Sequence, residues 1–385
     1  MTAMFQSRLN RIQLASLIIG IAALIASVIG AFANPKQFFF SYLFAELFWL
    51  GLSLGCFVVT MIHQLAGGRW GYPTRRFLEA GFMVLPLMAA LFIPIFFGLR
   101  YLYPWATTAH PIHADKAYQS SWAYIIRQVF FFFVWIWIAL RLRKWSLEQD
   151  ATNDAAPTRR ARFLSGPGTV IYGLLVTFAS IDWIVSLEKD WYSTMFGVIL
   201  AGGQILTAFA FAILLLALFQ KQEPFAAVVN KVHYHHLGNL LLTFVLFWTY
   251  VSFGQLLIIY SGDLPHELQW YLHRIAGSWK ALIAVIALFH FFLPFFLLLF
   301  RGIKRSVAAI ATLAALLLLV HIVDTYWLVM PTLHQTGVSV SWMDFTAVIG
   351  IGGLWIGYFL GRLKAAPLLP VNDPGMQFAF VYVKP

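Results

Sequence analysis

The sequence predicts an all-α polytopic membrane protein with ten transmembrane helices, and three observations lead to this prediction. Of the 385 residues, 61% are hydrophobic and 11% are charged, whereas a soluble domain has about one charged residue in four. Ten separate stretches are apolar enough to cross a bilayer, which takes about 20 residues each. The third observation is an internal repeat, which predicts two parallel four-helix bundles, spans two to five and six to nine, with one flanking helix on each side.

Hydropathy places the ten spans close together along the chain. They lie at residues 12–33, 39–64, 77–98, 121–143, 168–187, 194–220, 236–260, 278–300, 306–329 and 341–362. The first span ends like a signal-peptidase site, but its apolar run of about 20 residues exceeds the roughly 7–15 of a signal peptide, so we expect a retained helix. The predicted units are 1–38 with the N-terminal helix, 39–192 with the first bundle, 193–335 with the second bundle, and 336–385 with the last helix and a cytoplasmic tail.

Basic residues fall on alternate connections between the spans. Most of the 26 lysines and arginines lie near the two termini and on the connections after spans two, four, six and eight. By the positive-inside rule this side is cytoplasmic, so both termini are expected inside. The formal net charge of +11 then reflects orientation in the membrane and not nucleic-acid binding. On the outer side, segments 99–120 and 261–277 mix aromatic residues with His and Pro, which predicts interfacial stretches or docking surfaces.

Four short matches recur in the same order in the two predicted bundles. The pairs are 41–45 with 193–197, 97–98 with 253–254, 121–122 with 278–279, and 181–184 with 323–327. Matched spans run in the same direction, which is why the repeat is predicted to be parallel. The alternative is chance similarity among helices rich in Phe and Leu.

The single cysteine limits the redox chemistry that this chain can hold. Cys56 lies inside an apolar run, whereas iron–sulfur clusters need several thiolates and covalent haem needs a C-x-x-C-H motif. We therefore expect no cofactor in this chain unless histidine ligates it. His290, near the middle of span eight, is the best candidate for a haem ligand, but the sequence suggests no histidine partner at its level.

Span two carries a polar stripe through most of the membrane. Its members, at helical spacing, are Glu46, Ser53, Cys56, Thr60 and His63, and from the first to the last the helix rises about 25 Å. A carboxylate and an imidazole linked by hydroxyl groups or water are what a proton pathway needs. The alternative is a seam of small residues that packs against neighbouring helices.

Further ionisable residues fall in the outer third of the spans. A charge in the bilayer core costs about 2.5–3.5 kcal/mol on insertion scales, so ionisable residues within spans are candidates for function. Asp182 and Asp324 occupy matched positions of the repeat, and His321 shares a helix face with Asp324. We interpret these three residues as members of a proton pathway. Structural ion pairs are expected instead for Arg127, Lys280 and Asp344.

Histidines gather at the cytoplasmic end of the predicted membrane region. His235 and His236 of span seven lie at the same level as His63 of span two, and Asn239 follows one turn later. Because histidine changes its charge near neutral pH, we interpret these residues as the entrance of the proton pathway. The alternative is that the histidines simply face water.

Four segments of the chain resemble a known family. They read FASIDWIVSLEKDWYSTMFG (178–197), HLGNLLLTF (236–244), FGQLLIIYSGDLPHELQWYLHR (253–274) and PFFLLLFR (294–301). On these segments, and over most of residues 40–374, the sequence is similar to the ActF-type membrane subunits of bacterial alternative complex III. Those subunits belong to the NrfD/PsrC family of polysulfide-reductase membrane subunits.

The resemblance implies ten helices in two four-helix bundles and a place in a quinol:electron-acceptor oxidoreductase. Such a complex works in a respiratory or photosynthetic electron transport chain of the bacterial cytoplasmic (inner) membrane. The implied partners are a paralogous membrane subunit, ActC, with the chief quinol site, iron–sulfur and multihaem c-type cytochrome subunits, and in some cases cytochrome oxidase. Haem c, iron–sulfur clusters and quinol would belong to those partners, while this chain supplies proton half-channels and anchors the redox subunits.

Three other functions remain open at this point. A stand-alone secondary transporter also has repeats and charges inside the membrane, although Pro86 and Pro94 of span three have no counterpart in span seven. A quinone-binding anchor of another NrfD-type reductase is the second alternative. The third is a b-type cytochrome, which would need His290 as a ligand.

Overall fold

The structure is a computed structural model that describes residues 3–107, 118–152, 154–188, 191–370 and 372–377. These residues form helices, turns and connections without a strand. They contain ten helical spans long and apolar enough to cross a membrane, which confirms the predicted all-α, multi-pass chain. The spans are Met4–Ala33, Pro35–Ala66, Gly71–Leu102, Ser121–Ala151, Ala156–Leu187, Phe196–Phe219, Lys231–Gly262, Trp279–Leu299, Val307–Thr332 and Trp342–Lys364.

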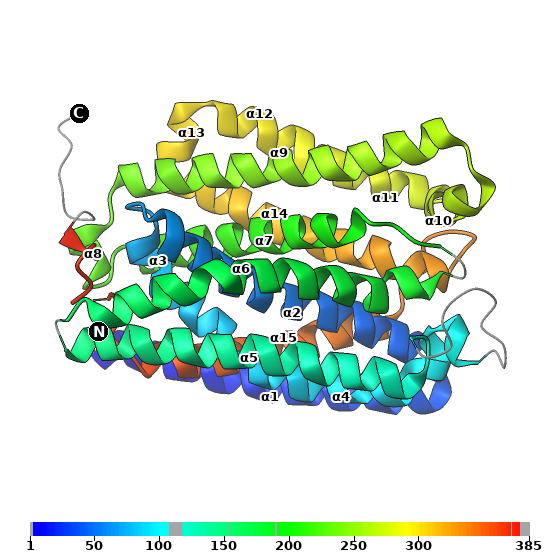
Figure 1. Ribbon diagram of the computed structural model, residues 1–385, viewed down its shortest axis with the longest axis horizontal. Coiled ribbons are helices and arrows are strands. Elements are labelled where there is room, and N and C mark those ends of the chain that lie inside the picture. The colour runs from blue at the N-terminus through cyan, green and yellow to red at the C-terminus, as the bar shows by residue number, and fades with distance from the viewer. Residues whose placement is uncertain (1–2, 108–117, 153, 189–190, 371, 378–385) are drawn as a thin grey trace.

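The individual helices are labelled in Figure 1. The long ones are α1 (Ala3–Ala33), α2 (Pro35–Ala66), α3 (Gly71–Phe82), α4 (Leu85–Leu102), α5 (Ser121–Ala151), α6 (Ala156–Trp183), α7 (Phe196–Phe219), α9 (Lys231–Gly262), α14 (Val307–Val329) and α15 (Trp342–Lys364). Span eight consists of α11 (Trp279–Ile286), the π-helical segment η3 (Ala287–Phe292) and α12 (Leu293–Leu299). The short helices are α8 (Phe225–Val228), α10 (Pro265–Ile275) and α13 (Arg301–Arg305), with 3-10 turns η1 (Pro104–Ala106), η2 (Val185–Leu187) and η4 (Met330–Thr332).

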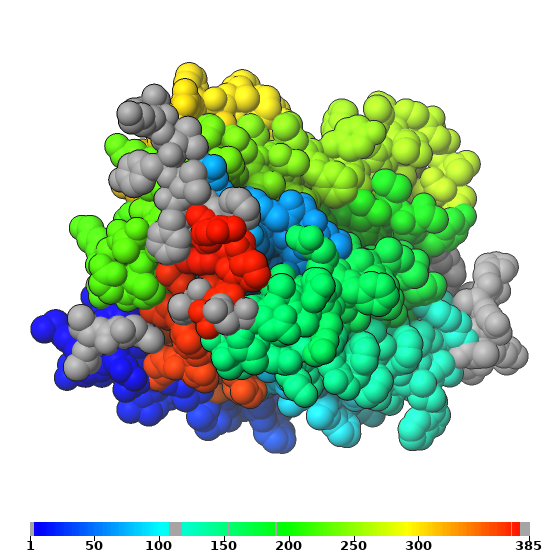
Figure 2. Space-filling model, turned by 60° about the vertical axis from the view of Figure 1, so that its left-hand side comes forward, coloured from blue at the N-terminus to red at the C-terminus, as the bar shows by residue number. Residues whose placement is uncertain are grey.

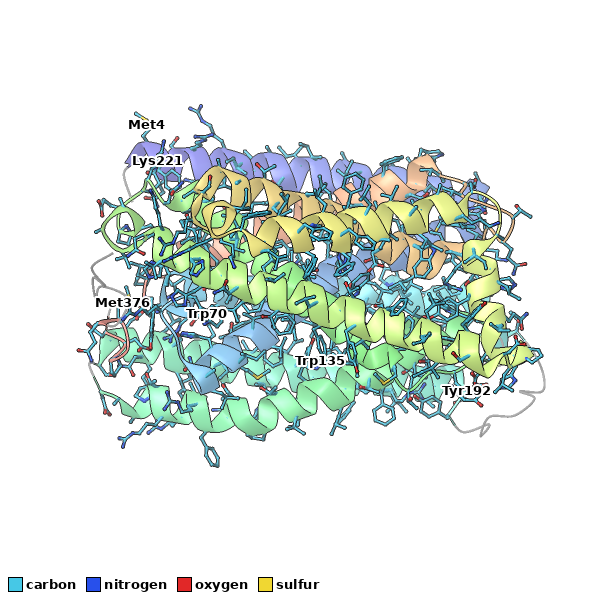
Figure 3. The ribbon with its side chains drawn as sticks, turned by 90° about the horizontal axis from the view of Figure 1, so that it is seen from above. Met4, Trp70, Trp135, Tyr192, Lys221 and Met376 are labelled. Atoms are coloured by element: carbon cyan, nitrogen blue, oxygen red, sulfur yellow. The ribbon has the colours of Figure 1, made fainter. Side chains whose placement is uncertain are left out.

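The long helices lie side by side, and successive connections alternate between two ends (Figure 1). One end, here called the basic end, holds the start of α1, the end of α15 and the α2–α3, α5–α6, α7–α9 and α12–α14 connections. Met4, Lys221 and Met376 lie at the basic end, and Tyr192 lies at the opposite end (Figure 3). The connections rich in Lys and Arg therefore share one end of the molecule, as their alternation in the sequence predicts.

Helix α2 lies at the centre of the molecule. It contacts α3, α4, α6, α7, α14 and α15. Of its most hydrophobic 18-residue stretch, 94% is buried inside the protein. Its approach to α7 depends on Gly55, where an added Cβ would fall 2.0 Å from the carbonyl oxygen of Gln204. Small residues allow such close backbone contacts between membrane helices. Helix α1, in contrast, is peripheral. It packs along α15, and only 17% of its most hydrophobic 18-residue stretch is buried.

Two groups of helices have the same order of contacts. In the first group α2 contacts α4, α4 contacts α5, α5 contacts α6, and α6 returns to α2. In the second group α7 contacts α9, α9 contacts α12, α11 contacts α14, and α14 returns to α7. The two groups meet along α2 and α7.

The sequence-based boundaries differ from the structure in two places. The basic stretch 144–166, expected as a loop, is mostly helical, because α5 continues to Ala151 and α6 begins at Ala156. Hydropathy detects only the apolar part of a helix, whereas Arg, Lys, Gln and Ala continue it into water. Span three is two helices that meet at Met83 and Val84. Pro86 follows, and it cannot donate the backbone hydrogen bond that would join them.

Segment 261–277, expected as an interfacial stretch or docking surface, is in part tightly packed. Segment 261–277 contains α10, whose Trp270 is 2% exposed and stacks on Trp191 with ring centroids 4.9 Å apart. Segment 99–120 completes α4 and forms η1, while its residues 108–117 lie outside the described part of the chain. At least α10 is therefore part of the folded bundle and not only an interfacial helix.

Candidate functional site

Three ionisable side chains meet inside the second group of helices. The rings of His290 on η3 and His321 on α14 have centroids 5.6 Å apart and planes inclined by 21°. Nδ1 of His321 lies 3.4 Å from Oδ2 of Asp324, one turn further along α14. All three residues are buried. The expectation that His290 has no histidine partner at its level is wrong, since His321 is that partner.

A local irregularity of span eight explains why the partner was missed. His290 lies within the π-helical segment η3, where the helix holds an extra residue in its turn. Such segments occur frequently at functional sites. They also shift the direction of side chains, so α-helical spacing alone does not predict where His290 points. Both of its ring nitrogens are buried without a hydrogen-bond partner in the described chain, and Trp248 of α9 covers the ring with centroids 4.2 Å apart.

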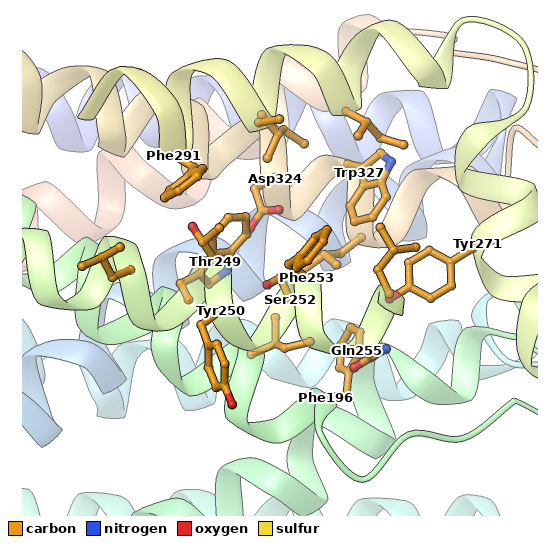
Figure 4. Close-up of a pocket in the computed structure, with 18 of the residues that line it drawn as sticks. Phe196, Thr249, Tyr250, Ser252, Phe253, Gln255, Tyr271, Phe291, Asp324 and Trp327 are labelled. Atoms are coloured by element: carbon orange, nitrogen blue, oxygen red, sulfur yellow. The ribbon is translucent and has the colours of Figure 1, made fainter. Parts of the chain in front are cut away.

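An apolar pocket of about 630 Å³ lies beside Asp324, lined by residues of α7, α9, α10, α11, η3 and α14. Figure 4 shows its mainly aromatic wall, including Phe196, Phe253, Tyr271, Phe291 and Trp327. Its polar lining consists of Thr249, Ser252, Gln255 and Asp324. Oγ of Ser252 is buried without a partner among the described residues. The pocket thus offers an apolar ligand a wide aromatic surface and a few polar groups, one of them a carboxyl group.

Glu46 is a second buried carboxyl group, in the N-terminal half of α2. It is 0% exposed, and neither of its carboxyl oxygens has a hydrogen-bond partner in the part of the chain that the structure describes. Tyr42, one turn earlier, donates to the backbone oxygen of Leu91 at 2.7 Å and not to Glu46. An uncompensated charge at such a place is costly. Only a proton, water or an approaching donor could satisfy these oxygens.

Ser53, Thr60 and His63 of the α2 stripe make polar contacts with another helix or with backbone oxygens. Oγ of Ser53 accepts a hydrogen bond from Nε1 of Trp355 on α15 at 2.8 Å. The Thr60 hydroxyl donates to the backbone oxygen of Cys56 at 2.8 Å, and Nε2 of His63 lies 3.0 Å from a backbone oxygen of the α2–α3 connection. These contacts do not link the stripe side chains to one another. They favour the packing seam for Ser53, Cys56 and Thr60.

The first group of helices contains an ion pair between two side chains, near the end of the molecule opposite the basic end. Arg127 of α5 donates to both carboxyl oxygens of Asp182 on α6, at 2.8 and 2.9 Å. Nε2 of Gln128 donates to the same carboxylate at 2.8 Å, and the Tyr118 hydroxyl at 3.3 Å. Burial and the charge of Asp182 raise the pKa of Tyr118 to about 12, so its hydroxyl remains a donor at neutral pH. Arg127 and Asp182 therefore form an ion pair with each other. The structural role expected for Arg127 and the proton-pathway role expected for Asp182 stay predictions.

Asp344 and Lys280, the other two residues expected in ion pairs, have no ion-pair partner among the described residues. Asp344 instead accepts hydrogen bonds from Oγ of Ser41 (2.5 Å), Nε2 of Gln37 (3.1 Å) and the backbone nitrogen of Ser341 (2.8 Å). Lys280 is exposed near the start of α11. The expectation failed because neutral donors of α2 and of the α15 N-terminus satisfy Asp344, while Lys280 is not enclosed by the bundle.

The residues expected to form a proton entrance do not form one cluster. His235 and His236 lie on the first turns of α9 with ring centroids 6.1 Å apart. Asn239 accepts a hydrogen bond from Nζ of Lys304 at 2.7 Å. No hydrogen bond or ring contact joins these residues to His63 within the described part of the molecule. Their role in proton uptake stays a prediction.

A buried charge cluster at the basic end was not expected from the sequence. Glu79 accepts hydrogen bonds from Nη1 of Arg76 (2.6 Å), Nη1 of Arg143 (2.5 Å) and Oγ of Ser146 (2.5 Å). Arg76 also pairs with Asp150. The three-residue spacing of Arg76 and Glu79 is the one signal that predicts part of this cluster. The rest depends on how α3 packs against α5.

A second unexpected cluster lies at the opposite end. Arg274 of α10 is 0% exposed and donates to Oε1 of Glu188 (3.0 Å) and to the backbone oxygen of Leu328 (2.8 Å). Burial lowers the pKa of Arg274 to about 10, although Glu188 opposes this, so the guanidinium is still charged at neutral pH. Nδ1 of His273 lies 3.2 Å from Oε2 of Glu188. The cluster fastens α10 to the ends of α6 and α14.

Metal binding has no support from the arrangement of side chains. The described residues contain no group of three or more His, Cys, Asp or Glu side chains placed to hold a metal ion. Comparison of the sequence with models of known families and with curated proteins gave no match.

Proposed function

We propose that this chain is a cofactor-free membrane subunit of a bacterial quinol:electron-acceptor oxidoreductase of the alternative complex III type. In this proposal it supplies proton-transfer groups within the membrane and anchors the redox subunits. One observation carries the proton-transfer part: His290, His321 and Asp324 meet in the interior of a membrane-spanning bundle. The ActF-like segments of the sequence support the assignment to this type of complex.

The chemistry of the three residues suits proton transfer. Imidazole and carboxyl groups are the side chains that gain and lose protons most readily near neutral pH. Structural residues in a membrane normally have their hydrogen bonds satisfied, as Asp182 has. His290, by contrast, has both nitrogens without a partner among the described residues, and Asp324 borders a pocket. Glu46 on the central helix would be a second proton-transfer group.

The proposal includes an architecture and an orientation. The two groups of helices with the same contact order are the proposed parallel repeats, α2 to α6 and α7 to α14. The basic end is proposed to face the cytoplasm, because Lys and Arg concentrate there. Electron carriers, namely haem c and iron–sulfur clusters, would then belong to partner subunits at the opposite end. The paralogous membrane subunit ActC would hold the chief quinol site.

The pocket beside Asp324 favours a second candidate function, a quinone-binding membrane anchor. Aromatic side chains and a few polar groups are typical of sites for lipid-soluble ring compounds. A photoreactive quinone analogue would label Tyr250 or Phe253 at the pocket in this case. Labelling confined to the partner subunits would reject this alternative.

The structure gives less support to a secondary transporter. Transporter sites usually lie where helices are broken at corresponding positions of two repeats. Here the interrupted spans are three, at Met83 and Val84, and eight, at η3. Span seven, which the repeat matches with span three, is the continuous helix α9.

Replacing Asp324 with Asn tests the proposed proton pathway. Asn keeps the size and polarity of the side chain but cannot exchange a proton. In the assembled complex, reconstituted in vesicles, we expect quinol-driven proton translocation to fall by about tenfold or more, within the range that a single acid–base group contributes. The measurement is the pH change on the two sides of the vesicle membrane after addition of quinol.

Asp263→Asn is the matched control for this experiment. Asp263 ends α9 in a left-handed conformation with φ of 47°, which Asn also tolerates, and it lies outside the pocket and the three-residue site. We expect this control to translocate protons at the normal rate. Unchanged quinol turnover together with unchanged translocation in Asp324→Asn would remove Asp324 from the pathway.

A further inference from the structure

The surface where α13 meets α9 at the basic end carries a concentration of positive charge. His235 of α9 lies within electrostatic range of Lys304, Arg305 and Arg301 of α13. We call these four residues the α13 cluster. The yellow spheres of α12 and α13 lie on the surface beside the yellow-green spheres of α9 (Figure 2). Arg301 is exposed, and His235 and Arg305 are half-buried, so the cluster has access to the surroundings of the protein.

The fold holds part of this cluster in place. Lys304 is 8% exposed, and its aliphatic chain passes over Gly238, where an added Cβ would fall 2.8 Å from Cγ. Its ammonium group donates to Oδ1 of Asn239 at 2.7 Å. The cation is thus held in a fixed, largely buried position by packing and by a hydrogen bond. This distinguishes Lys304 from a lysine that extends freely into water.

No carboxylate of the described residues neutralises the cluster. Arg301, Lys304 and Arg305 form no ion pair with any described residue, and Nε of Arg305 and Nδ1 of His235 are buried without hydrogen-bond partners there. The nearby N-termini of α9 and α14 have no acidic residue in their first turns. Helix N-termini add positive potential at this place. Like charges kept together in this way are unfavourable unless an anion joins them.

The cluster borders an apolar surface on the side of the membrane interior. Phe296, Leu299 and Phe300 directly precede Arg301 and are 56%, 53% and 64% exposed. A free anion would gain nothing from these side chains, whereas a lipid would place its acyl chains on them. The apolar side chains and the cations thus follow one another in the same order as the acyl chains and the charged headgroup of a phospholipid.

We infer that the α13 cluster binds the phosphate headgroup of an anionic phospholipid, with an acyl chain against Phe296, Leu299 and Phe300. Basic pockets between membrane helices are a known type of site for such headgroups. Arg301 and Arg305 would donate to the phosphate, since guanidinium groups match its geometry. Lys304, held by Asn239, would contribute a fixed charge. His235 is then part of a lipid site instead of a proton entrance.

The test uses the full chain as purified from the membrane, stripped of lipid in detergent. Phosphatidylglycerol and phosphatidylcholine are added in parallel series, and bound lipid is measured by native mass spectrometry together with Tm. We expect tighter binding and a larger rise in Tm with phosphatidylglycerol. The double variant Arg301→Gln/Arg305→Gln should bind it about 30-fold more weakly, as expected for the loss of two basic contacts at a membrane surface.

Arg8→Gln/Arg11→Gln is the matched control, because it removes the same charge from exposed positions of α1 at the same end. It should bind phosphatidylglycerol like the unmodified protein. Four results would overturn the inference. Three are equal effects of the two lipids, equal losses in both double variants, and a full rise in Tm with inorganic phosphate alone. The fourth is an acidic segment of a partner subunit that occupies the cluster in the intact complex with no lipid bound.

Discussion

Replacing Glu79 with alanine is expected to lower the free energy of unfolding by about 3–5 kcal/mol, the usual cost of removing one partner from a buried ion pair. Glu79 accepts hydrogen bonds from Arg76, Arg143 and Ser146, and its side chain is 2% exposed. Without it, Arg143 loses its only ion-pair partner among the described residues, and Arg76 keeps only Asp150. The loss should appear as a lower Tm of the purified protein in detergent.

Glu148→Ala is the control for this prediction. Glu148 also lies at the basic end, but its only described ion pair, with Arg160, is 3.6 Å long and its side chain is 36% exposed. Exposed pairs contribute about 0–1 kcal/mol, so the control should change Tm little. If Glu79→Ala and Glu148→Ala lower Tm equally, the buried cluster does not stabilise the fold as proposed.

Replacing Asp182 with alanine should cost about 3–5 kcal/mol for the same reason. Asp182 receives four hydrogen bonds, two of them from Arg127 and one each from Gln128 and Tyr118. The variant would leave the Arg127 guanidinium without its only described ion-pair partner inside a membrane span. The measurement is again Tm in detergent, together with the yield of folded protein.

A double variant separates a structural role of Asp182 from a functional one. In Asp182→Leu/Arg127→Met both charges are absent, and apolar replacements of a buried pair are often neutral for stability. We expect the double variant to recover most of the lost stability. If it also keeps normal proton translocation in the complex, Asp182 is structural only; if translocation is lost in a stable double variant, Asp182 belongs to the pathway.

Asp182 and Asp324 differ in their surroundings, which suggests different roles for the two groups of helices. The two residues occupy matched positions of the proposed repeat. Asp182 is held by an arginine and two further donors, whereas Asp324 lies beside His321, near His290, and borders a pocket. One half would thus have a fixed ion pair where the other has a group able to exchange protons.

Sequence patterns predict the spans well because the hydrophobic requirement of a membrane is strong and local. All ten predicted spans lie within, or within a few residues of, spans in the structure. The charged ends of α5 and α6 were missed, since their residues are hydrophilic and yet good helix formers. Helix ends in water depend on caps and packing more than on hydropathy.

The candidate site could be predicted only in part. The spacing of His321 and Asp324 indicates a shared helix face, and the structure places these residues together. His290 joins them from another helix through a π-helical segment, which no spacing rule predicts. Likewise Arg127 and Asp182 could each be recognised as costly charges, but their pairing depends on the packing of α5 against α6.

The most direct test of the central proposal is the identity of the proteins that remain bound to this chain after purification from its native membrane in mild detergent. We predict a paralogous membrane subunit together with iron–sulfur and multihaem c-type cytochrome subunits, and quinol oxidation by the purified assembly. A chain that purifies alone, without haem-bearing partners and without quinol-oxidising activity, would contradict the proposal.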